Sequence, residues 1–157
     1  MRVKVLNNSG NPLPKYQTEG SAAFDIAVSV DTIVEGSCAV LVSTGLHFAI
    51  PRGYEGQLRL RSSMYKRHVV MPNAPGTIDS DYRGEVKIPI RNLDPYTSVH
   101  FKAGERIAQM AIVKCPQVIL ETVSPDVFAS SEDYVFLSGR GSGGFGSTGV
   151  GIGPSGL

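Results

Sequence analysis

The chain has 157 residues, a net charge of +1 and 18% charged side chains. This length fits one domain, and a near-neutral charge without a basic run argues against nucleic-acid binding by bulk electrostatics. No apolar run is long enough to span a membrane and no secretory leader is recognisable. We therefore expect a soluble protein without nucleic-acid or membrane partners, located in the cytoplasm or, if it is viral, in the interior of the host cell.

Alternation of apolar and polar side chains is the dominant pattern and predicts an all-β protein. Strands are expected at residues 2–6, 23–28, 37–43, 45–50, 54–61, 85–92, 97–101, 105–113 and 117–123. Helix is limited to one short segment at most, best placed at "SMYKRH", residues 63–68. Many short strands separated by turn signals indicate an antiparallel sandwich or barrel, in which Pro89 should lie where its missing N–H disturbs no ladder.

The segment "RLRSSMYKRH", residues 59–68, holds the first polar cluster. Arg61 followed by Ser62 and Ser63 supplies a planar guanidinium and two hydroxyls, a grouping suited to phosphate oxygens. An equally simple interpretation is the charged end of a surface strand.

A denser polar cluster is "NAPGTIDSDYRGE", residues 73–85. Its turn-forming residues predict a tight hairpin that presents Asp79, Asp81, Tyr82 and Arg83. If the backbone is extended there, both aspartates share a face, and one of them could act as a base. The alternative is a solvated turn with local Asx hydrogen bonds.

Gln109 lies inside the otherwise apolar "GERIAQMAIV", residues 104–113. A buried amide needs partners, so Gln109 either satisfies the backbone or points into a site. Other chemistry lacks support, because the three histidines have no metal-ligand spacing and no nucleophile elbow of the G-x-S-x-G type occurs. Cys38 and Cys115 are too few for a disulfide framework or a cysteine-based zinc site.

The chain ends in a glycine-rich segment, "SGRGSGGFGSTGVGIGPSGL". We expect a β domain over residues 1–137 and a flexible arm over residues 138–157. A mobile spacer would need neither Arg140 nor Phe145. Glycine amides, the hydroxyls of Ser147 and Thr148 and one guanidinium could wrap a polyphosphate, so the arm could be a lid.

Five segments together resemble the five motifs of trimeric dUTPases, in order and approximate spacing. They are "GSAAFDIAVS", "RSSMYKRH", "NAPGTIDSDYRGEV", "GERIAQMAIV" and "GRGSGGFGSTG", and they cover residues 20–149. The third and fifth are the most specific, whereas the first two depart from the usual residues. The resemblance implies a jelly-roll-like β fold and a homotrimer with active sites shared between subunits. It also implies hydrolysis of dUTP to dUMP and pyrophosphate with Mg²⁺, which keeps uracil out of DNA and supplies dUMP for thymidylate synthesis.

The resemblance also assigns catalytic and phosphate-binding roles. Asp79 matches the aspartate that deprotonates the water attacking the α-phosphorus, and Asp25 matches the aspartate linked to the metal through water. The positions that match phosphate-binding residues are Arg61, Ser62, Ser63 and Gln109.

For the base and sugar, the resemblance implies that residues 73–78 read uracil largely through the backbone. Asn73, Gly76, Thr77 and Ile78 belong to this segment, and Asn73 would fix its shape or contact the base. Tyr82 would lie against the deoxyribose, and Lys87 would add a contact. In the arm, Phe145 would stack on uracil, and the terminal phosphate would be held by the region of Arg140, Gly144, Ser147 and Thr148.

Two alternatives remain. A dCTP deaminase shares the core and the Arg-Ser-Ser motif, but that family lacks the Ile-Asp-x-Asp-Tyr segment and the glycine-rich arm. A non-catalytic nucleotide-binding protein could use the same fold, although Asp25, Asp79, Gln109 and Arg140 are all retained.

Overall fold

The computed structural model describes residues 1–130 and divides the chain into two units, Met1–Gln117 and Val118–Leu157. The described part of the first unit contains antiparallel strands and one 3-10 helix, η1. In chain order these are β1 (Lys4–Asn7), β2 (Phe24–Ala27), β3 (Thr32–Val34), β4 (Ala39–Ser43), β5 (Leu46–Ala49), β6 (Tyr54–Leu60), η1 (Ser62–Arg67), β7 (Val69–Val70), β8 (Gly76–Ile78), β9 (Lys87–Asn92), β10 (Val99–Phe101) and β11 (Arg106–Lys114).

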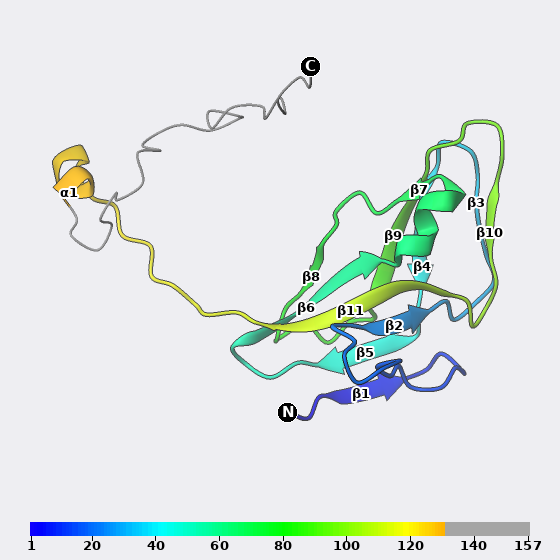
Figure 1. Cartoon of the computed structure of the whole chain (residues 1–157), viewed down its shortest axis with the longest axis horizontal. Helices are drawn as coiled ribbons and strands as arrows, with labels where there is room; N and C mark the ends of the chain where they lie inside the picture. Colours follow the sequence, from blue (N-terminus) through cyan, green and yellow to red (C-terminus); the bar gives the residue numbers. More distant parts are fainter. Residues whose placement is uncertain (131–157) are drawn as a thin grey trace, which may run out of the picture. The chain divides into compact units, whose positions relative to one another are not determined.

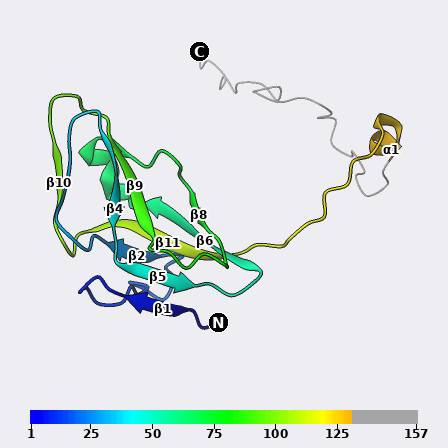
Figure 2. The ribbon, with the colours of Figure 1, turned by 180° about the vertical axis from the view of Figure 1, so that it is seen from behind.

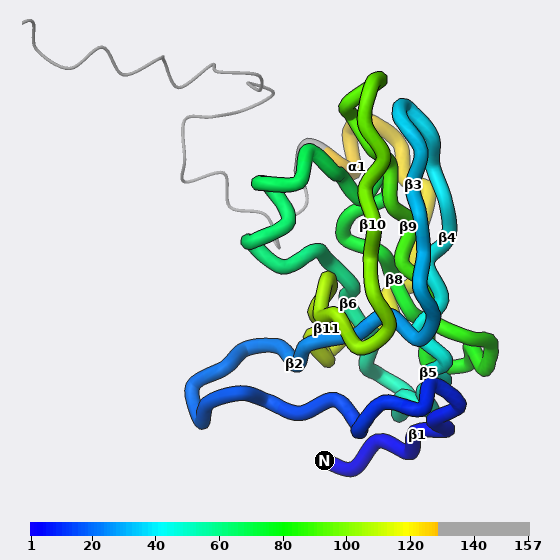
Figure 3. The backbone as a smooth tube through the Cα atoms, turned by 90° about the vertical axis from the view of Figure 1, so that its right-hand side faces the viewer, coloured from blue at the N-terminus to red at the C-terminus, as the bar shows by residue number. Residues whose placement is uncertain are grey.

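The strands of this unit form two larger sheets and two strand pairs (Figure 1). The four-stranded sheet has the order β2-β11-β6-β8, and it is seen from behind in Figure 2. The three-stranded sheet has the order β4-β9-β7, while β1 pairs with β5 and β3 with β10. Figure 3 shows β3, β4, β9 and β10 running alongside one another. The predicted all-β, jelly-roll-like antiparallel architecture is confirmed.

Alternation along the strands directs one apolar face of each sheet into a common core. Leu58 on β6 is the register partner of Met110 on β11, and both are almost fully buried. Val42 on β4 is likewise the partner of Ile88 on β9, and both have 0% exposure. These side chains belong to a single apolar cluster, where burial of each large aliphatic group contributes about 1.5–3 kcal/mol.

Pro89 lies in β9 opposite Leu41 of β4. On the other side of β9, the short strand β7 reaches only as far as Arg91. Pro89 therefore lies where, among the described residues, β9 is paired on one side alone, as the prediction for its missing N–H requires.

Several element predictions were wrong or incomplete. The strand expected at residues 117–123 is not formed, and residues 115–124 contain no regular element, since alternation alone makes no strand without a pairing partner among the described residues. The second unit has a short α-helix, α1 (Pro125–Ser130), that was not predicted. Strands β3, β7 and β8 were also missed, because two or three residues carry too little periodicity to be recognised. The predicted helix at residues 63–68 is present as η1.

Candidate active site

Asp25 and Gln109 are brought together by strand pairing. Gln109 on β11 lies directly opposite Asp25 on β2 and, on its other side, opposite Arg59 on β6. Directly opposed residues point to the same face of a sheet, so β2, β11 and β6 form a polar row. The amide of Gln109 donates to the carbonyl of Leu60 at 3.3 Å. Of the two roles predicted for this half-buried amide, satisfaction of the backbone is therefore observed.

The carboxylate of Asp25 lies between two guanidinium groups. Oδ1 is 3.1 Å from Nε of Arg61, and Oδ2 is 3.2 Å from Nη1 of Arg106. The contact with Arg106 is close enough for an ion pair but is not aligned as a hydrogen bond, so Oδ2 is a buried oxygen without a hydrogen-bond partner. Only 12% of the Asp25 side chain is exposed. Arg106 was missed by sequence reasoning, because its proximity to Asp25 depends on the pairing of β11 with β2.

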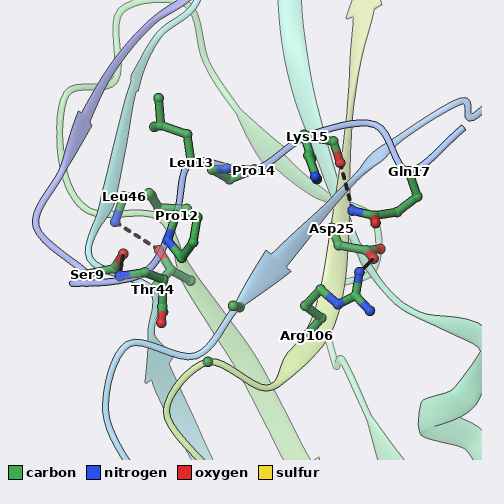
Figure 4. A pocket seen from close by; sticks show the side chains of 13 residues that line it. Ser9, Pro12, Leu13, Pro14, Lys15, Gln17, Asp25, Thr44, Leu46 and Arg106 are labelled. Atoms are coloured by element: carbon green, nitrogen blue, oxygen red, sulfur yellow. Dashed lines mark hydrogen bonds and ion pairs between the residues drawn. The ribbon is translucent and has the colours of Figure 1, made fainter. Parts of the chain in front are cut away.

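Figure 4 shows Arg106 directed at Asp25 within a cavity of about 240 Å³. The N-terminal segment contributes Lys15 and Gln17 to the same cavity, and Gln17 is held by a hydrogen bond to the carbonyl of Lys15. Two basic side chains, Lys15 and Arg106, and the carboxylate of Asp25 therefore line the same cavity.

Ser62 and Ser63 form the start of η1, directly after Arg61. Arg61 is anchored to β11, since its amide donates to the carbonyl of Ile107 at 3.0 Å and its Nη1 donates to that of Arg106 at 3.1 Å. Both serines are exposed, and their hydroxyls make no hydrogen bond among the described residues. They are consequently available to a ligand.

A second group of predicted residues lines another cavity, of about 650 Å³. Its walls include Thr77, Ile78, Asp79, Tyr82 and Lys87. The backbone at the aspartates is a turn and not the extended conformation on which a shared face depended, since the amide of Tyr82 donates to the carbonyl of Asp79 at 3.2 Å. Asp79 is exposed.

The tight hairpin predicted for residues 73–85 is not formed. The flanking strands β7 and β9 do pair antiparallel, but the segment between them is long and contains β8, which pairs with β6 in the other sheet. A tight hairpin would join its two paired strands by a turn of only a few residues. Gly76 is buried at the start of β8, where an added Cβ would lie 2.8 Å from Cε of Met71 and 3.5 Å from Nδ2 of Asn73. The amide of Asn73 thus lies beside the backbone that it was predicted to shape.

Tyr82 packs against the backbone of Gly84. An added Cβ at Gly84 would lie only 2.3 Å from Oη of Tyr82, and this hydroxyl donates to the carbonyl of Glu85 at 2.9 Å. The ring is 43% exposed and therefore presents a face to the cavity.

Glu85 supports the same wall and was not predicted. Its Oε1 accepts hydrogen bonds from the amides of Thr44 and Gly45, at 3.0 and 2.9 Å, while Oε2 lies 3.7 Å from Nζ of Lys87. Burial is the largest single influence on its pKa and acts to raise it. The amide of Gly45, the charge of Lys87, the amide of Thr44 and the hydroxyl of Ser43 together outweigh burial and hold the pKa of Glu85 below its usual value.

The two groups of residues lie at opposite ends of β6. Arg61 follows the last residue of β6, whereas Asp79 follows Ile78, whose register partner is Gly56 near the start of β6. In this antiparallel register Asp79 lies one step beyond the level of Gly56, six residues before Arg61 along β6. At about 3.3 Å per residue, this corresponds to roughly 20 Å. No hydrogen bond or ion pair of residues 1–130 joins the predicted phosphate-binding side chains to Asp79 or Tyr82.

The remaining predicted site residues, Arg140, Gly144, Phe145, Ser147 and Thr148, lie within residues 131–157, outside the described part of the chain. The predicted boundary at residue 138 lies there as well. Among the described residues, no group of three or more His, Cys, Asp or Glu side chains could hold a metal ion. No helix in the described range is long and apolar enough to cross a membrane.

Comparisons with known proteins identify close relatives. A family model described as dUTPase matches residues 10–149. The chain is 43% identical over 152 residues to the deoxyuridine 5'-triphosphate nucleotidohydrolase of Zymomonas mobilis, covering 96% of this chain and 97% of the relative. It is 42% identical over 154 residues to the protein of the same name from Rhizobium etli, covering 94% and 92%.

Solved structures show the same likeness. The dUTPase of Staphylococcus bacteriophage 80alpha, solved with dUPNHPP, matches with a TM-score of 0.77 and 26% identity over 95% of this chain and 99% of that chain. A dUTPase from phage phi11 of S. aureus, solved with a structural Mg(II) ion, matches with a TM-score of 0.72 and 22% identity over 82% and 100%, which is a likeness of fold.

Proposed function

The chain belongs to the dUTPase family, and we propose that it is a dUTP diphosphatase that hydrolyses dUTP to dUMP and pyrophosphate. The observation that carries this proposal is the exposed carboxylate of Asp79 beside Tyr82, on the wall of a cavity of about 650 Å³, in a chain that matches the family model from residue 10 to 149. By this reaction the protein would keep uracil out of DNA and supply dUMP for thymidylate synthesis.

In the proposed reaction, Asp79 accepts a proton from a water molecule that attacks the α-phosphorus. The new bond joins this water oxygen to the α-phosphorus, and the bond from the α-phosphorus to the oxygen bridging to the β-phosphorus breaks. Pyrophosphate leaves with that bridging oxygen. A positioned general base contributes about 10²- to 10⁴-fold to the rate. The exposure of Asp79 supports this role because both water and substrate can reach it.

The phosphate chain is assigned to Arg61, Ser62, Ser63 and Gln109. Nε and Nη1 of Arg61 are engaged with Asp25 and a backbone carbonyl, so Nη2 remains to donate to phosphate oxygens. The free hydroxyls of the two serines supply further donors. Protein dipoles and charges fixed in this way stabilise the developing negative charge without reorganisation.

Mg²⁺ fits the residues present if it is held mainly by the substrate. Mg²⁺ prefers octahedral oxygen ligands and keeps several waters. The described residues offer no three-ligand cluster, but Oδ2 of Asp25 is a buried oxygen that lacks a hydrogen bond. Asp25 would therefore accept a hydrogen bond from a metal-bound water. When bound, Mg²⁺ would neutralise charge on the triphosphate oxygens.

Uracil and deoxyribose are assigned to the opposite cavity. Residues 73–78 would read the base largely through backbone groups, with Asn73, Gly76, Thr77 and Ile78 setting their geometry. Cytosine would present a donor where uracil has an acceptor and would leave buried groups unpaired. Tyr82 would lie against the deoxyribose, where a 2′-hydroxyl finds no room. Lys87 lines the same cavity, which supports a contact with substrate.

The length of β6 supports the proposed homotrimer with sites shared between subunits. A single chain holds Asp79 and Arg61 roughly 20 Å apart, which exceeds the span over which both could act on one α-phosphate. Placing one chain's Asp79 beside another chain's Arg61 would complete the site. The arm of residues 138–157 would then close over the nucleotide, with Phe145 on the base and Arg140, Gly144, Ser147 and Thr148 at the phosphates.

The test is a panel of dUTP, dCTP, dTTP and UTP, with release of pyrophosphate measured in the presence of Mg²⁺. We expect hydrolysis of dUTP far above the other three. Equal rates would contradict the assigned specificity, and ammonia release from dCTP would indicate a deaminase instead. Tight binding of dUTP without any pyrophosphate would favour a non-catalytic role.

A further inference from the structure

The short helix η1 carries Ser62 and Ser63, yet little holds it in place. It is a 3-10 helix, whose hydrogen-bond geometry is poorer than that of an α-helix, and its first turn has no side-chain cap. It ends at His68, a non-glycine residue with a positive φ of 53°. Met64 is its one buried residue. A phosphate-binding helix of this kind needs an additional tie to the β-sheets.

Arg67, the last residue of η1, supplies that tie. Its Nη1 donates to Oε1 of Glu105 at 2.5 Å, and its Nη2 donates to the carbonyl of His100. The guanidinium also lies 4.5 Å from the centre of the Phe101 ring, and Phe101 is 1% exposed. One planar group thus makes a charged hydrogen bond, a backbone hydrogen bond and a cation–π contact at once.

The partner of Arg67 is itself held in position. Oε2 of Glu105 accepts a hydrogen bond from the amide of Lys102 at 3.2 Å, and its carbonyl accepts one from the amide of Val28 at 2.9 Å. Glu105 immediately precedes β11, which carries Gln109. The contact with Arg67 therefore joins η1 to the start of the strand that holds another predicted phosphate contact.

Both ends of η1 are consequently fastened to the same region. At the N-terminal end, Arg61 bonds to the carbonyls of Ile107 and Arg106, and at the C-terminal end Arg67 bonds to Glu105 and His100. On the basis of the proposed function, we propose that Arg67 is a positioning residue that holds the hydroxyls of Ser62 and Ser63 in register with Gln109 for binding the phosphate chain. Arg67 acts through η1 and does not contact the substrate.

A guanidinium is required for this role. The contacts use two separate nitrogens and a flat face, whereas lysine offers a single ammonium on a flexible stem. Arg67→Lys therefore preserves the positive charge but loses the planar, two-nitrogen group that makes these contacts. Glu105→Gln is the second variant, and it weakens the same contact by removing the negative charge of the partner. The matched control is Lys66→Gln, which removes a neighbouring exposed charge of η1 and leaves the Arg67 contacts intact.

The experiment compares binding of dUpNHpp and of dUMP to the full-length chain and its variants by titration calorimetry with Mg²⁺. If the serine hydroxyls are misplaced, the affinity for dUpNHpp should fall by about tenfold or more in Arg67→Lys and in Glu105→Gln. Binding of dUMP, which lacks the β- and γ-phosphates, should change by less than about twofold, as should both ligands in Lys66→Gln. The double variant should bind dUpNHpp no more weakly than Arg67→Lys alone, because Arg67→Lys already breaks the contact with Glu105.

Two results would overturn the inference: dUpNHpp affinity within about twofold of the unmodified chain in Arg67→Lys, or equal losses for dUpNHpp and dUMP, which would mark a general structural role. The proposed function fails separately, if the unmodified chain binds dUpNHpp but releases no pyrophosphate from dUTP.

Discussion

Oδ1 of Asp25 lies 3.1 Å from Nε of Arg61, so the predicted metal-linked aspartate and the predicted phosphate-binding arginine form one ion pair. With Arg106 on Oδ2, two positive charges face one carboxylate that is largely buried. The carboxylate orients the guanidinium of Arg61 and partly offsets its charge. A change at Asp25 should consequently affect stability as well as catalysis.

Asp25→Asn should lower the free energy of unfolding by about 1–3 kcal/mol, because it leaves two guanidinium groups without their counter-charge. Chemical denaturation of the folded protein measures this loss. The control is Asp31→Asn, which breaks an exposed ion pair with Lys102 and should change stability little, since solvent screens that pair. Equal effects of the two substitutions would contradict a special role for the Asp25 pair.

Glu85 should make stability depend on acid pH. Because the pKa of Glu85 is lowered in the folded chain, its contribution is complete above the unfolded value of about 4.3. That contribution is lost as the pH falls through the folded pKa. Denaturation curves between neutral and acid pH should therefore show a shallower decline in Glu85→Gln than in the unmodified chain.

The control for Glu85 is Glu19→Gln, since Glu19 is exposed and makes no hydrogen bond among the described residues. Its acid decline should match that of the unmodified chain. Identical declines in all three proteins would show that the hydrogen bonds of Glu85 do not contribute to acid stability.

The interactions of Asp25 and Glu85 also show what a sequence can and cannot predict. The strands at residues 54–60 and 87–92 were predictable, because alternation is a local property. The ion pair of Asp25 with Arg106, by contrast, depends on the register of two strands about 80 residues apart in the chain. The hydrogen bonds from the amides of residues 44 and 45 to Glu85 join segments about 40 residues apart. Such contacts leave no local pattern.

The segment of residues 117–123 shows an element that was predicted but is not formed. Its alternating side chains resemble those of a strand, but pairing is a property of two segments, and no partner is present among the described residues of this chain. Residues 73–85 were likewise assigned correctly to a turn-rich connection and wrongly to a tight hairpin, because β8 lies within the segment and pairs with β6. That pairing could not be read from the turn residues.

Gly84→Ala should loosen the discrimination between dUTP and UTP. The added methyl would lie 2.3 Å from Oη of Tyr82 and displace a ring proposed to exclude the 2′-hydroxyl. We expect the ratio of kcat/KM for the two nucleotides to fall by about tenfold, equivalent to about 1.4 kcal/mol. Pyrophosphate release from each nucleotide gives this ratio. Gly20→Ala, where nothing lies within 4 Å of the added atom, should leave the ratio unchanged, and an unchanged ratio in Gly84→Ala would remove Tyr82 from sugar selection.

Deletion of residues 138–157 should nearly abolish turnover while the oligomer persists, as judged by light scattering. The arm is proposed to contact base and phosphates together, and contact with both would be needed to offset the entropy of ordering its glycines. Deletion of residues 150–157 alone should retain turnover, since the family match ends at residue 149. Full activity without residues 138–157 would contradict a role for the arm in the reaction.

The final prediction concerns sharing of the site between subunits. Asp79→Asn and Gln109→Ala should each be nearly inactive, because one loses the proposed base and the other a phosphate contact. If Asp79 and Gln109 of one site come from different chains, co-refolded mixtures of the two variants should regain activity. In a random equal mixture about a quarter of the sites would contain both native residues.

Each variant refolded alone is the control, and it should stay inactive at the same total concentration. Mixing the two variants without unfolding them should also give no activity until subunits exchange, so the recovery should follow the exchange rate. A co-refolded mixture that remains inactive would mean that one chain supplies both residues. That result would require the roughly 20 Å between the ends of β6 to be bridged within a single chain, and it would overturn the proposed division of the site between subunits.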